Sequence, residues 1–414
     1  IVPADLTDNA CINVYKLTNE YYASSETCNI WRICPKTLNV MKKINLDKIM
    51  GVNLACSHVQ YMSNENYAYN LSSSFLTGMK YHLIKIPLFH YDDDDDDNNK
   101  TLLEQSKILT TIGSRWTTCI AYYHSFGITE NFIIFIELPL LVNGFKLATC
   151  TPKGRPLKDC FEWQPNERAK FYVISKQNGR ILQRYYSEPF FYFHMINSYE
   201  DNGHIVTDIM AYKNATILDK WDLHQMRKNI YDDNNQAVPT RFVMPIITDY
   251  NDVKIGENLV TLANTDATAI LMEKDLIMLT GESLCKPGFE LPTINYRHFN
   301  GHKYKYCYGS GIFEQGNFSR SICKLNVEDK TVIIWKDTDD FFPGECIFIA
   351  RPGSDDEDDG IILSLVLSGN ELLSHYLLIL DARTFTEIAR AEIATGTGII
   401  PPTIHGVFDY VVDE

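Results

Sequence analysis

Short runs of apolar residues, separated by polar turn residues, follow one another along most of the chain. Residues 10–25, 171–182 and 361–380 each contain two such runs with turn residues between them. Apolar runs of strand length with turns this frequent favour strands joined by hairpins, and the fold class predicted is all-β. Residues 223–236 have the best helical pattern, and they end in a polar loop.

Residues 189–193 form an aromatic run that ends at His194. Large apolar side chains at consecutive positions require burial on both faces, so the run predicts a buried strand. Residues 200–203 then predict a hairpin turn, and residues 204–209 the returning strand. An imidazole in a buried strand needs a partner, either a backbone carbonyl or a metal ion, because an unpaired buried polar group costs about 1–3 kcal/mol.

Three further histidines have comparable settings, which strengthens the metal interpretation. His124 follows aromatic residues and precedes the strand-like residues 132–136, His58 follows an apolar segment, and His405 lies near the C-terminal end. The first intervals are roughly 70 residues and the last about three times as long, as a ring of similar repeats would give. The remaining histidines are predicted to be structural or at the surface: His82, His90, His204, His224, His298, His302 and His375.

Four neutral imidazoles that converge on one point suit a borderline divalent ion such as Fe(2+), Zn(2+) or Cu(2+). Nearby carboxylates are expected, because they offset the charge of the ion and fix the tautomer of each histidine. Glu26, Glu290 and Glu357 are the candidates. Glu290 lies between apolar residues and would be buried, whereas Glu357 on its own also fits a solvated acidic turn.

The composition adds limits on partners and location. The 414 residues are 45% hydrophobic and carry a net charge of −15, which allows a large core and argues against nucleic acid as a partner. The eleven cysteines show no paired spacing, which favours reduced thiols and a cytoplasmic protein. No apolar run is long enough to span a membrane. Residues 92–99, an aspartate run followed by asparagines, are predicted to be a solvated insertion.

Several motifs together resemble the carotenoid cleavage oxygenase family, in particular its animal branch. The resemblance runs the whole length of the chain. It rests on residues 6–9, 13–15, 21–27, 124–131 (His-Ser-Phe-Gly-Ile-Thr-Glu-Asn), 193–203, 289–296 (Phe-Glu-Leu-Pro-Thr-Ile-Asn-Tyr), 357–360 and 405–408 (His-Gly-Val-Phe).

This resemblance implies a single domain over residues 1–414, built as a seven-bladed β-propeller with a helical or loop cap over one face. It also implies one Fe(2+) on the propeller axis. The family's four histidine ligands fall on His58, His124, His194 and His405, and its supporting glutamates fall on Glu26, Glu290 and Glu357. At His58 the chain departs from the family's usual His-Pro-His run. The family pattern further implies residues before Ile1.

The implied activity is a dioxygenase reaction, in which a carotenoid double bond and O2 give two aldehydes, with or without coupled trans–cis isomerisation. The alternatives are a retinyl ester isomerohydrolase and an inactive carotenoid- or retinoid-binding propeller. A carotenoid comes from a lipid bilayer, so peripheral membrane association is expected. Residues 133–142 are the candidate contact, with residues 139–142 exposed, although the strand-like part of this segment fits a core strand equally well.

Overall fold

The computed structural model describes residues 10–75, 78–90, 100–150, 153–228, 235–249, 253–273, 276–286, 288–311, 319–393 and 400–409. The chain divides into two compact units, Ile1–Pro189 and Phe190–Glu414. The predicted acidic insertion and the motif at residues 6–9 lie outside the described residues, as do residues 229–234 of the predicted helix. The single seven-bladed propeller stays a prediction.

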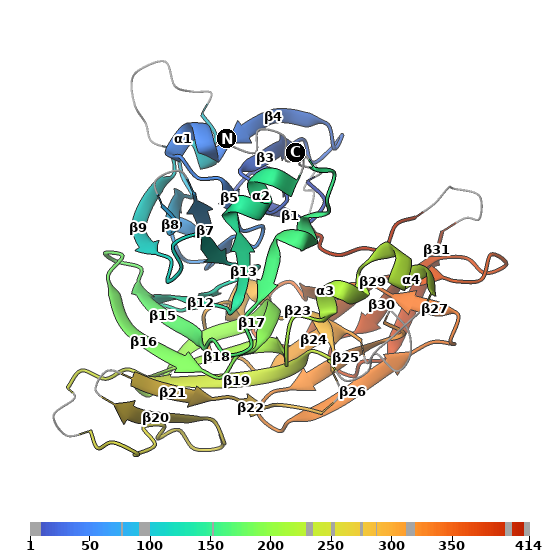
Figure 1. Ribbon diagram of the computed structural model, residues 1–414. Coiled ribbons are helices and arrows are strands. Elements are labelled where there is room, and N and C mark those ends of the chain that lie inside the picture. The colour runs from blue at the N-terminus through green and yellow to red at the C-terminus, as the bar shows by residue number, and fades with distance from the viewer. Residues whose placement is uncertain are drawn as a thin grey trace. The chain divides into compact units, whose positions relative to one another are not determined.

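Unit 1 consists of antiparallel strands in four groups (Figure 1). Within each group, the strands are named in the order in which they are hydrogen-bonded to one another. The first two groups are β1 (Asn13–Leu17), β2 (Glu20–Ser24), β3 (Asn29–Ile33) and β4 (Val40–Asn45); and β5 (Leu54–Ala55), β7 (Tyr67–Ser74), β8 (Lys80–Pro87) and β9 (Lys107–Gly113), with β6 (Gln60–Tyr61) also paired with β7. The other two are β10 (Cys119–Ala121), β13 (Leu140–Asn143) and β14 (Phe161–Trp163); and β11 (Gly127–Ile128), β12 (Phe132–Glu137), β15 (Ala169–Ser175) and β16 (Ile181–Ser187).

Unit 2 is also built from antiparallel strands (Figure 1). Its groups are β17 (Phe191–Asp201), β18 (His204–Tyr212), β19 (Val238–Pro245) and β22 (Glu282–Ser283); β23 (Glu290–Thr293), β24 (Tyr306–Ser310), β25 (Ser321–Asn326) and β26 (Thr331–Lys336); β27 (Phe341–Pro343), β29 (Gly360–Ser368), β30 (Tyr376–Asp381) and β31 (Glu387–Glu392), with β28 (Ile347–Ala350) also on β29; and the pair β20 (Thr268–Glu273) and β21 (Leu276–Thr280). The fold is therefore predominantly β, as predicted.

The predicted hairpins are confirmed. The aromatic run begins β17, which pairs with β18 through a turn at Asn202 and Gly203. Both turn residues have positive φ, 46° and 77°, the conformation that a two-residue hairpin needs and that Asn-Gly tolerates best. The residues at 171–182 and 361–380 likewise fall on the pairs β15–β16 and β29–β30.

The helices of the described residues are short. They are α1 (Leu46–Met50), η1 (Leu103–Gln105), α2 (Gly144–Cys150), η3 (Leu157–Cys160), α3 (Ile217–Lys220), α4 (Leu223–Lys228) and α5 (Tyr296–Phe299). The predicted helix at residues 223–236 is thus confirmed in its first part. Within the described ranges, no helix has the length and hydropathy to cross a membrane.

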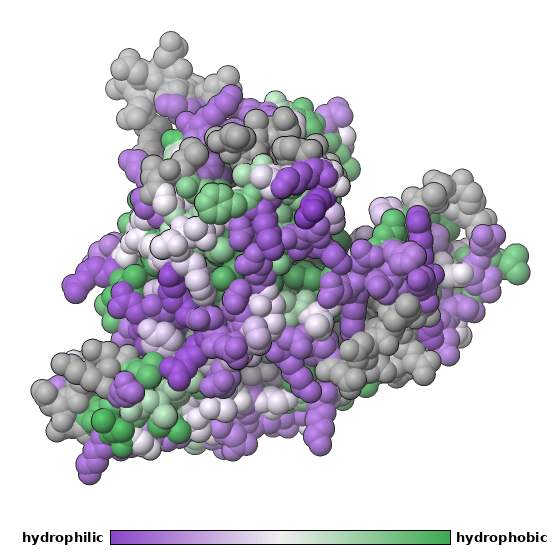
Figure 2. Space-filling view, viewed as in Figure 1, coloured by the Kyte–Doolittle hydropathy of each residue, from purple (hydrophilic) through white to green (hydrophobic). Residues whose placement is uncertain are grey.

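The predicted membrane contact at residues 139–142 is wrong, because these residues belong to the core of unit 1. Leu140 and Leu141 lie in β13 and are 1% and 3% exposed. Strand β13 is hydrogen-bonded on both sides, to β10 and to β14. On the face shown in Figure 2, hydrophilic residues predominate and hydrophobic residues are scattered among them.

A buried carboxylate in unit 1 anchors the strand that leads to His124. Glu137 accepts hydrogen bonds from Arg115 Nε (2.7 Å) and from the hydroxyl of Tyr81 (3.1 Å). The same hydroxyl accepts the backbone N–H of Ala121 at 2.6 Å, at the end of β10. Because Glu137 has no exposed surface, its charge requires these partners, and the network fixes the chain just before His124.

Candidate metal centre

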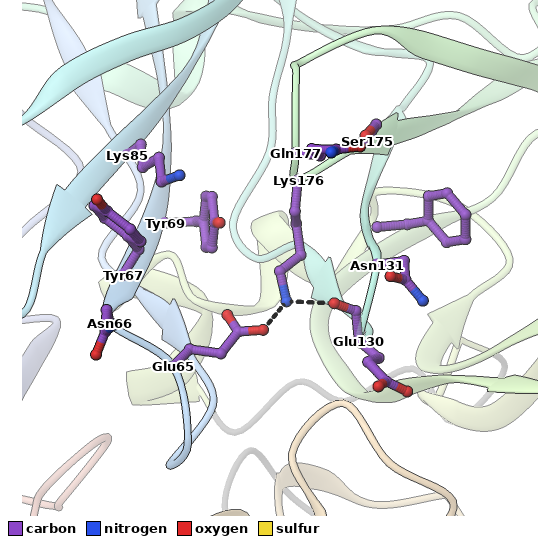
Figure 3. A pocket seen from close by; sticks show the side chains of 11 residues that line it. Glu65, Asn66, Tyr67, Tyr69, Lys85, Glu130, Asn131, Ser175, Lys176 and Gln177 are labelled. Atoms are coloured by element: carbon purple, nitrogen blue, oxygen red, sulfur yellow. Dashed lines mark hydrogen bonds and ion pairs between the residues drawn. The ribbon is translucent and has the colours of Figure 1, made fainter.

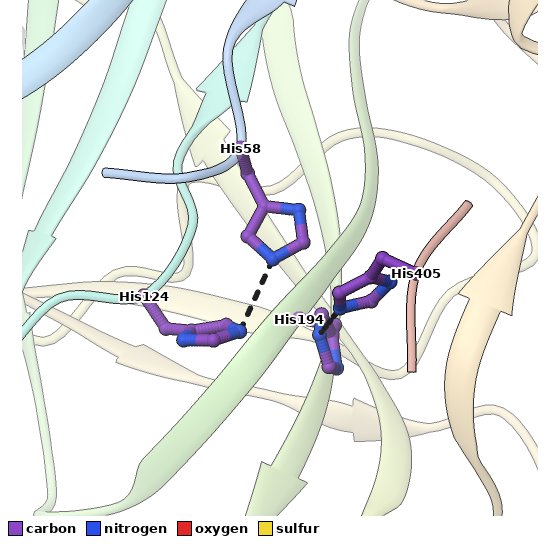
Figure 4. A group of neighbouring side chains, drawn as sticks. All are labelled: His58, His124, His194 and His405. Carbon is purple, nitrogen blue, oxygen red and sulfur yellow. Dashed lines mark hydrogen bonds between the residues drawn. The ribbon is translucent and has the colours of Figure 1, made fainter. Parts of the chain in front are cut away.

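Unit 1 brings His58 and His124 together. His58 lies in the loop between β5 and β6, and His124 in the loop between β10 and β11. Their Nε2 atoms are 3.1 Å apart (Figure 4). On its other side, the His124 ring donates from Nδ1 to Glu26 Oε1 at 2.5 Å. Glu26, predicted to support a histidine, is thus in contact with His124, and its supporting role stays a prediction.

Tyr122 completes the surroundings of His124, and the sequence analysis did not single it out. Its hydroxyl donates to Glu26 Oε1 at 2.8 Å and lies 3.0 Å from His124 Nδ1. Burial, and then the Glu26 charge, raise the pKa of Tyr122 well above its usual value. The hydroxyl therefore stays protonated and holds the carboxylate in place beside the imidazole.

Hydrogen bonds from neighbouring strands hold the short segment that carries His58. Cys56 Sγ donates to the backbone carbonyl of His124 at 2.7 Å, which ties the two histidine loops together. Asn70 Nδ2, on β7, donates to the carbonyl of Cys56 at 3.1 Å, and Asn13 Nδ2, on β1, donates to that of Ser57 at 2.9 Å. The loop is thus fixed although it lacks the family's usual His-Pro-His run.

Unit 2 brings His194 and His405 together. Their Nε2 atoms are also 3.1 Å apart (Figure 4). His194 is buried in β17, and its Nδ1 donates to Glu290 Oε2 at 2.6 Å. Glu290 begins β23 and is itself buried. Glu290 is thus buried in its apolar setting and contacts His194, and its role as a supporting carboxylate stays a prediction.

The carboxylate that supports His405 is Glu345, which the sequence analysis missed. His405 Nδ1 donates to Glu345 Oε1 at 2.7 Å, and the backbone N–H of Gly406 donates to Oε2 at 3.0 Å. Burial raises the pKa of Glu345, and the contacts with His405 and Gly406 oppose that rise. The residue before it is glycine because a Cβ on Gly344 would collide with Thr403 Oγ1. The segment with His405 can therefore pass close to Glu345.

Glu357, also predicted to support a histidine, has other contacts in the structure. Its carboxylate accepts the backbone N–H groups of Lys305 and Tyr306, at 2.8 and 2.6 Å. These contacts hold the start of β24 rather than a histidine ring. Glu357 lies among other acidic residues, so the sequence gives no signal for its backbone-binding role. Glu345 has no acidic neighbour and lies two residues before the apolar strand β28, which is a signal that could have identified it.

His82 and His204, two of the histidines predicted to be structural or at the surface, have hydrogen-bond partners within the protein. His82 lies between the hydroxyls of Ser74 (2.8 Å) and Thr111 (2.9 Å), and burial lowers its pKa. His204 is 2.9 Å from the carbonyl of Asn202 through Nδ1 and accepts the N–H of Thr261 at Nε2, at 3.2 Å. Both rings have protein partners, so these predictions are confirmed.

The histidine pairs have the chemistry of metal ligands. A neutral imidazole carries one N–H donor and one bare nitrogen. Both His194 and His405 use Nδ1–H to reach a carboxylate, so their Nε2 lone pairs are bare and lie 3.1 Å apart. Two lone pairs this close repel each other unless they share a cation. The spacing is compatible with two nitrogens that each lie about 2.1 Å from one ion.

A β-sheet scaffold with histidines that contact carboxylates defines a metal-binding β protein. Comparison with known proteins identifies its family. The family model described as retinal pigment epithelial membrane protein matches residues 1–409. The chain belongs to this family, which is the carotenoid cleavage oxygenase family that the sequence motifs predict.

Named relatives and solved structures agree with this membership. The chain is 34% identical over 417 residues to a mitochondrial carotenoid-cleaving dioxygenase of Mustela putorius furo, covering 97% of this chain and 74% of that protein. It is 36% identical over 411 residues to the beta,beta-carotene 15,15'-dioxygenase of Gallus gallus, covering 98% and 76%.

Among solved structures, cobalt-substituted apocarotenoid oxygenase of Synechocystis superposes with a TM-score of 0.74 at 21% identity, covering 98% of this chain and 76% of that one. A variant of the same enzyme gives a TM-score of 0.75 at 20% identity, with the same coverage. At such identities, the likeness shows the fold.

Proposed function

We propose that this protein is an iron-dependent dioxygenase that cleaves one double bond of a carotenoid with O2 and releases two aldehydes, retinal or apocarotenals. The observation that carries the metal site is the pair of bare Nε2 atoms on His194 and His405. Membership of a family whose relatives are named as carotenoid dioxygenases supports the reaction and the substrate class.

In this proposal, His58, His124, His194 and His405 together bind one Fe(2+). Imidazole nitrogens suit this ion, and four neutral ligands leave its charge uncompensated. Glu26, Glu290 and Glu345 would offset that charge through the rings that they contact. The seven-bladed propeller remains the proposed arrangement, since it would bring the four inner histidines to one axis.

The bound iron would supply the activation of O2, which the side chains of the protein cannot do by themselves. The protein's own contribution is to hold each histidine in one tautomer. The carboxylates of Glu26, Glu290 and Glu345 keep a proton at Nδ1 of His124, His194 and His405, so Nε2 is the unprotonated nitrogen that would bind a metal. Tyr122 holds Glu26 in the position that this requires.

Isotope labelling tests the reaction. We expect iron-loaded protein incubated with beta-carotene and 18O2 to give two aldehydes that each carry one labelled oxygen, because both atoms of O2 enter the products. The aldehydes would be reduced to alcohols at once, to prevent exchange with water, and measured by mass spectrometry. A retinyl ester incubated in parallel would stay intact.

Two other outcomes would replace the proposal. An unlabelled retinol formed from the retinyl ester would indicate an isomerohydrolase, since that reaction takes no oxygen from O2. Binding of the carotenoid without any turnover by iron-loaded protein would indicate a binding protein. Either result overturns the dioxygenase assignment while leaving the metal site in place.

We also propose that α2 and η3 bind a lipid surface, from which a carotenoid would be taken. Phe145 on α2 and Leu157 on η3 are 71% and 50% exposed. Residues 144–159 carry four basic residues against one acidic residue, in a chain whose net charge is −15. Apolar side chains beside basic ones suit a bilayer that contains anionic lipids.

Vesicle sedimentation tests this surface. The double variant Phe145→Ser, Leu157→Ser is expected to bind phosphatidylcholine–phosphatidylserine vesicles at least about tenfold more weakly than the unaltered protein, because insertion of each side chain contributes about 1.5–3 kcal/mol. Leu182→Ser is the matched control, since Leu182 is an exposed leucine on β16 of the same unit. Equal loss in the control, or none in the double variant, would rule this surface out.

A further inference from the structure

A pocket of about 670 Å³ lies within unit 1 (Figure 3). It is bounded by the turn before β7, by β7 and β8, by the turn before β12 and by the residues that end β15 and follow it. A volume of this size is that of a pocket for a small organic ligand. None of the four candidate metal-binding histidines lines it.

Lys176 is a structural part of the pocket wall. Its side chain is buried, and its Nζ donates to Glu65, to the carbonyl of Thr129 (2.9 Å) and to the carbonyl of Glu130 (2.9 Å). These three bonds use the three protons of the ammonium group. The charges of Lys176 and Glu65 offset each other, and the carboxylate of Glu130 points away from Lys176 in Figure 3.

Lys85 is in a different situation. Its Nζ lies 3.8 Å from the centre of the Tyr67 ring, a cation–π contact. No carboxylate of the described residues lies within ion-pair distance of it. Lys85 and the exposed Glu130 are therefore the two charged residues of the lining without an ion-pair partner among the described residues, and in Figure 3 the Glu130 carboxylate lies across the pocket from Lys85, beyond Lys176. In Figure 3, the nitrogen of Lys85 is directed toward Tyr69.

Tyr69 supplies a second donor beside Lys85. Its hydroxyl has no hydrogen-bond partner among the described residues. Burial, and then the charge of Glu65, raise the pKa of Tyr69 to about 12, so the hydroxyl keeps its proton at neutral pH. An ammonium group and a hydroxyl that both lack an acceptor form a receptor for one anionic group.

The remaining lining defines the rest of the ligand. The rings of Tyr67, Tyr69 and Phe132 offer flat apolar surface to the pocket. From this combination, we propose that the pocket binds an amphipathic monocarboxylate, with its carboxylate at Lys85 and Tyr69 and its flat apolar body against the aromatic rings. This site is separate from the proposed metal centre and does not depend on the proposed reaction.

Calorimetric titration with 2-naphthoate, an aromatic monocarboxylate, tests the proposal on the metal-loaded full chain. We expect 2-naphthoate to bind at least about tenfold more tightly than the neutral 2-naphthamide, because a hydrogen bond to a charged group is worth about 1.5–3 kcal/mol. Lys85→Met should remove that preference, and Tyr69→Phe should reduce it by about threefold or more.

Lys170→Met is the matched control, because Lys170 also lies over a tyrosine ring in unit 1, at 4.9 Å from Tyr172, but does not line the pocket. It should leave 2-naphthoate binding unchanged. Equal affinity for the two probes, or an unchanged Lys85→Met variant, would overturn the proposal. Loss of binding when the metal is chelated would also overturn it, because the carboxylate would then be a ligand of the metal.

Discussion

Replacing His194 with alanine is expected to reduce bound iron from about one ion per chain to less than a tenth of that. The substitution removes one imidazole ligand and leaves Glu290 buried without the ring that it contacts. Loss of a residue that merely orients a ligand costs about 10–100-fold in metal affinity, so loss of the ligand itself should exceed that range. Iron would be measured by mass spectrometry after dialysis against a weak chelator, and carotenoid cleavage should fall with it.

His298→Ala provides the control, since His298 is an exposed histidine on α5 of the same unit. It should retain iron and activity. The circular dichroism spectrum of His194→Ala should match that of the chelated unaltered protein, which separates loss of metal from loss of fold. Iron retained at an unchanged level by His194→Ala would contradict the proposed centre.

The second large effect is expected for Glu345→Gln, which should weaken iron binding about 10–100-fold. The substitution keeps the size of the side chain but removes the negative charge that backs His405. It also places a neutral amide where the ring nitrogen donates, so the histidine is held less firmly in the tautomer with a bare Nε2. Competition with a chelator of known affinity would give the change.

Glu357→Gln is the informative comparison. Its carboxylate contacts the backbone of residues 305 and 306, so the substitution should lower the free energy of unfolding by about 1–2 kcal/mol and leave iron affinity unchanged. If Glu357→Gln instead weakens iron binding while Glu345→Gln does not, the assignment of these two carboxylates must be reversed.

The burial of Glu290 could be predicted from the sequence, whereas the contact between Glu345 and His405 could not. The setting of Glu290 is local, because an acidic residue between apolar neighbours on a strand must be buried with a partner. The role of Glu345 depends on a segment 60 positions away, which passes Gly344 closely enough for His405 to reach the carboxylate. No short pattern contains both parts of this contact.

Periodicity was a sound guide to the strands and a poor guide to exposure. The hairpins at β15–β16, β17–β18 and β29–β30 follow directly from apolar runs and turn residues. The same apolar character suggested a membrane contact at residues 139–142, yet β13 is a central strand with partners on both sides. Whether an apolar run faces solvent is decided by its neighbours in the sheet, and for β13 these are β10 and β14, which the run itself does not contain.

The pocket at Lys85 was beyond sequence reasoning for a related reason. Its lining comes from separate turns and strands of unit 1, each contributing one to three residues. Lys176 precedes a polar turn and Lys85 lies on a strand. Only the structure shows that the Lys176 ammonium group has three acceptors, whereas Lys85 has no ion-pair partner among the described residues.

The pairing of β17 with β18 is irregular where His194 lies. The register shifts between Tyr192 and Met195, and the residues between them face no partner in β18. A substitution at position 194 therefore removes no paired position between β17 and β18, and the pairs on either side still hold the two strands together. The pairing of this sheet therefore does not depend on the metal ligand, and the fold and the metal chemistry can be altered separately at this position.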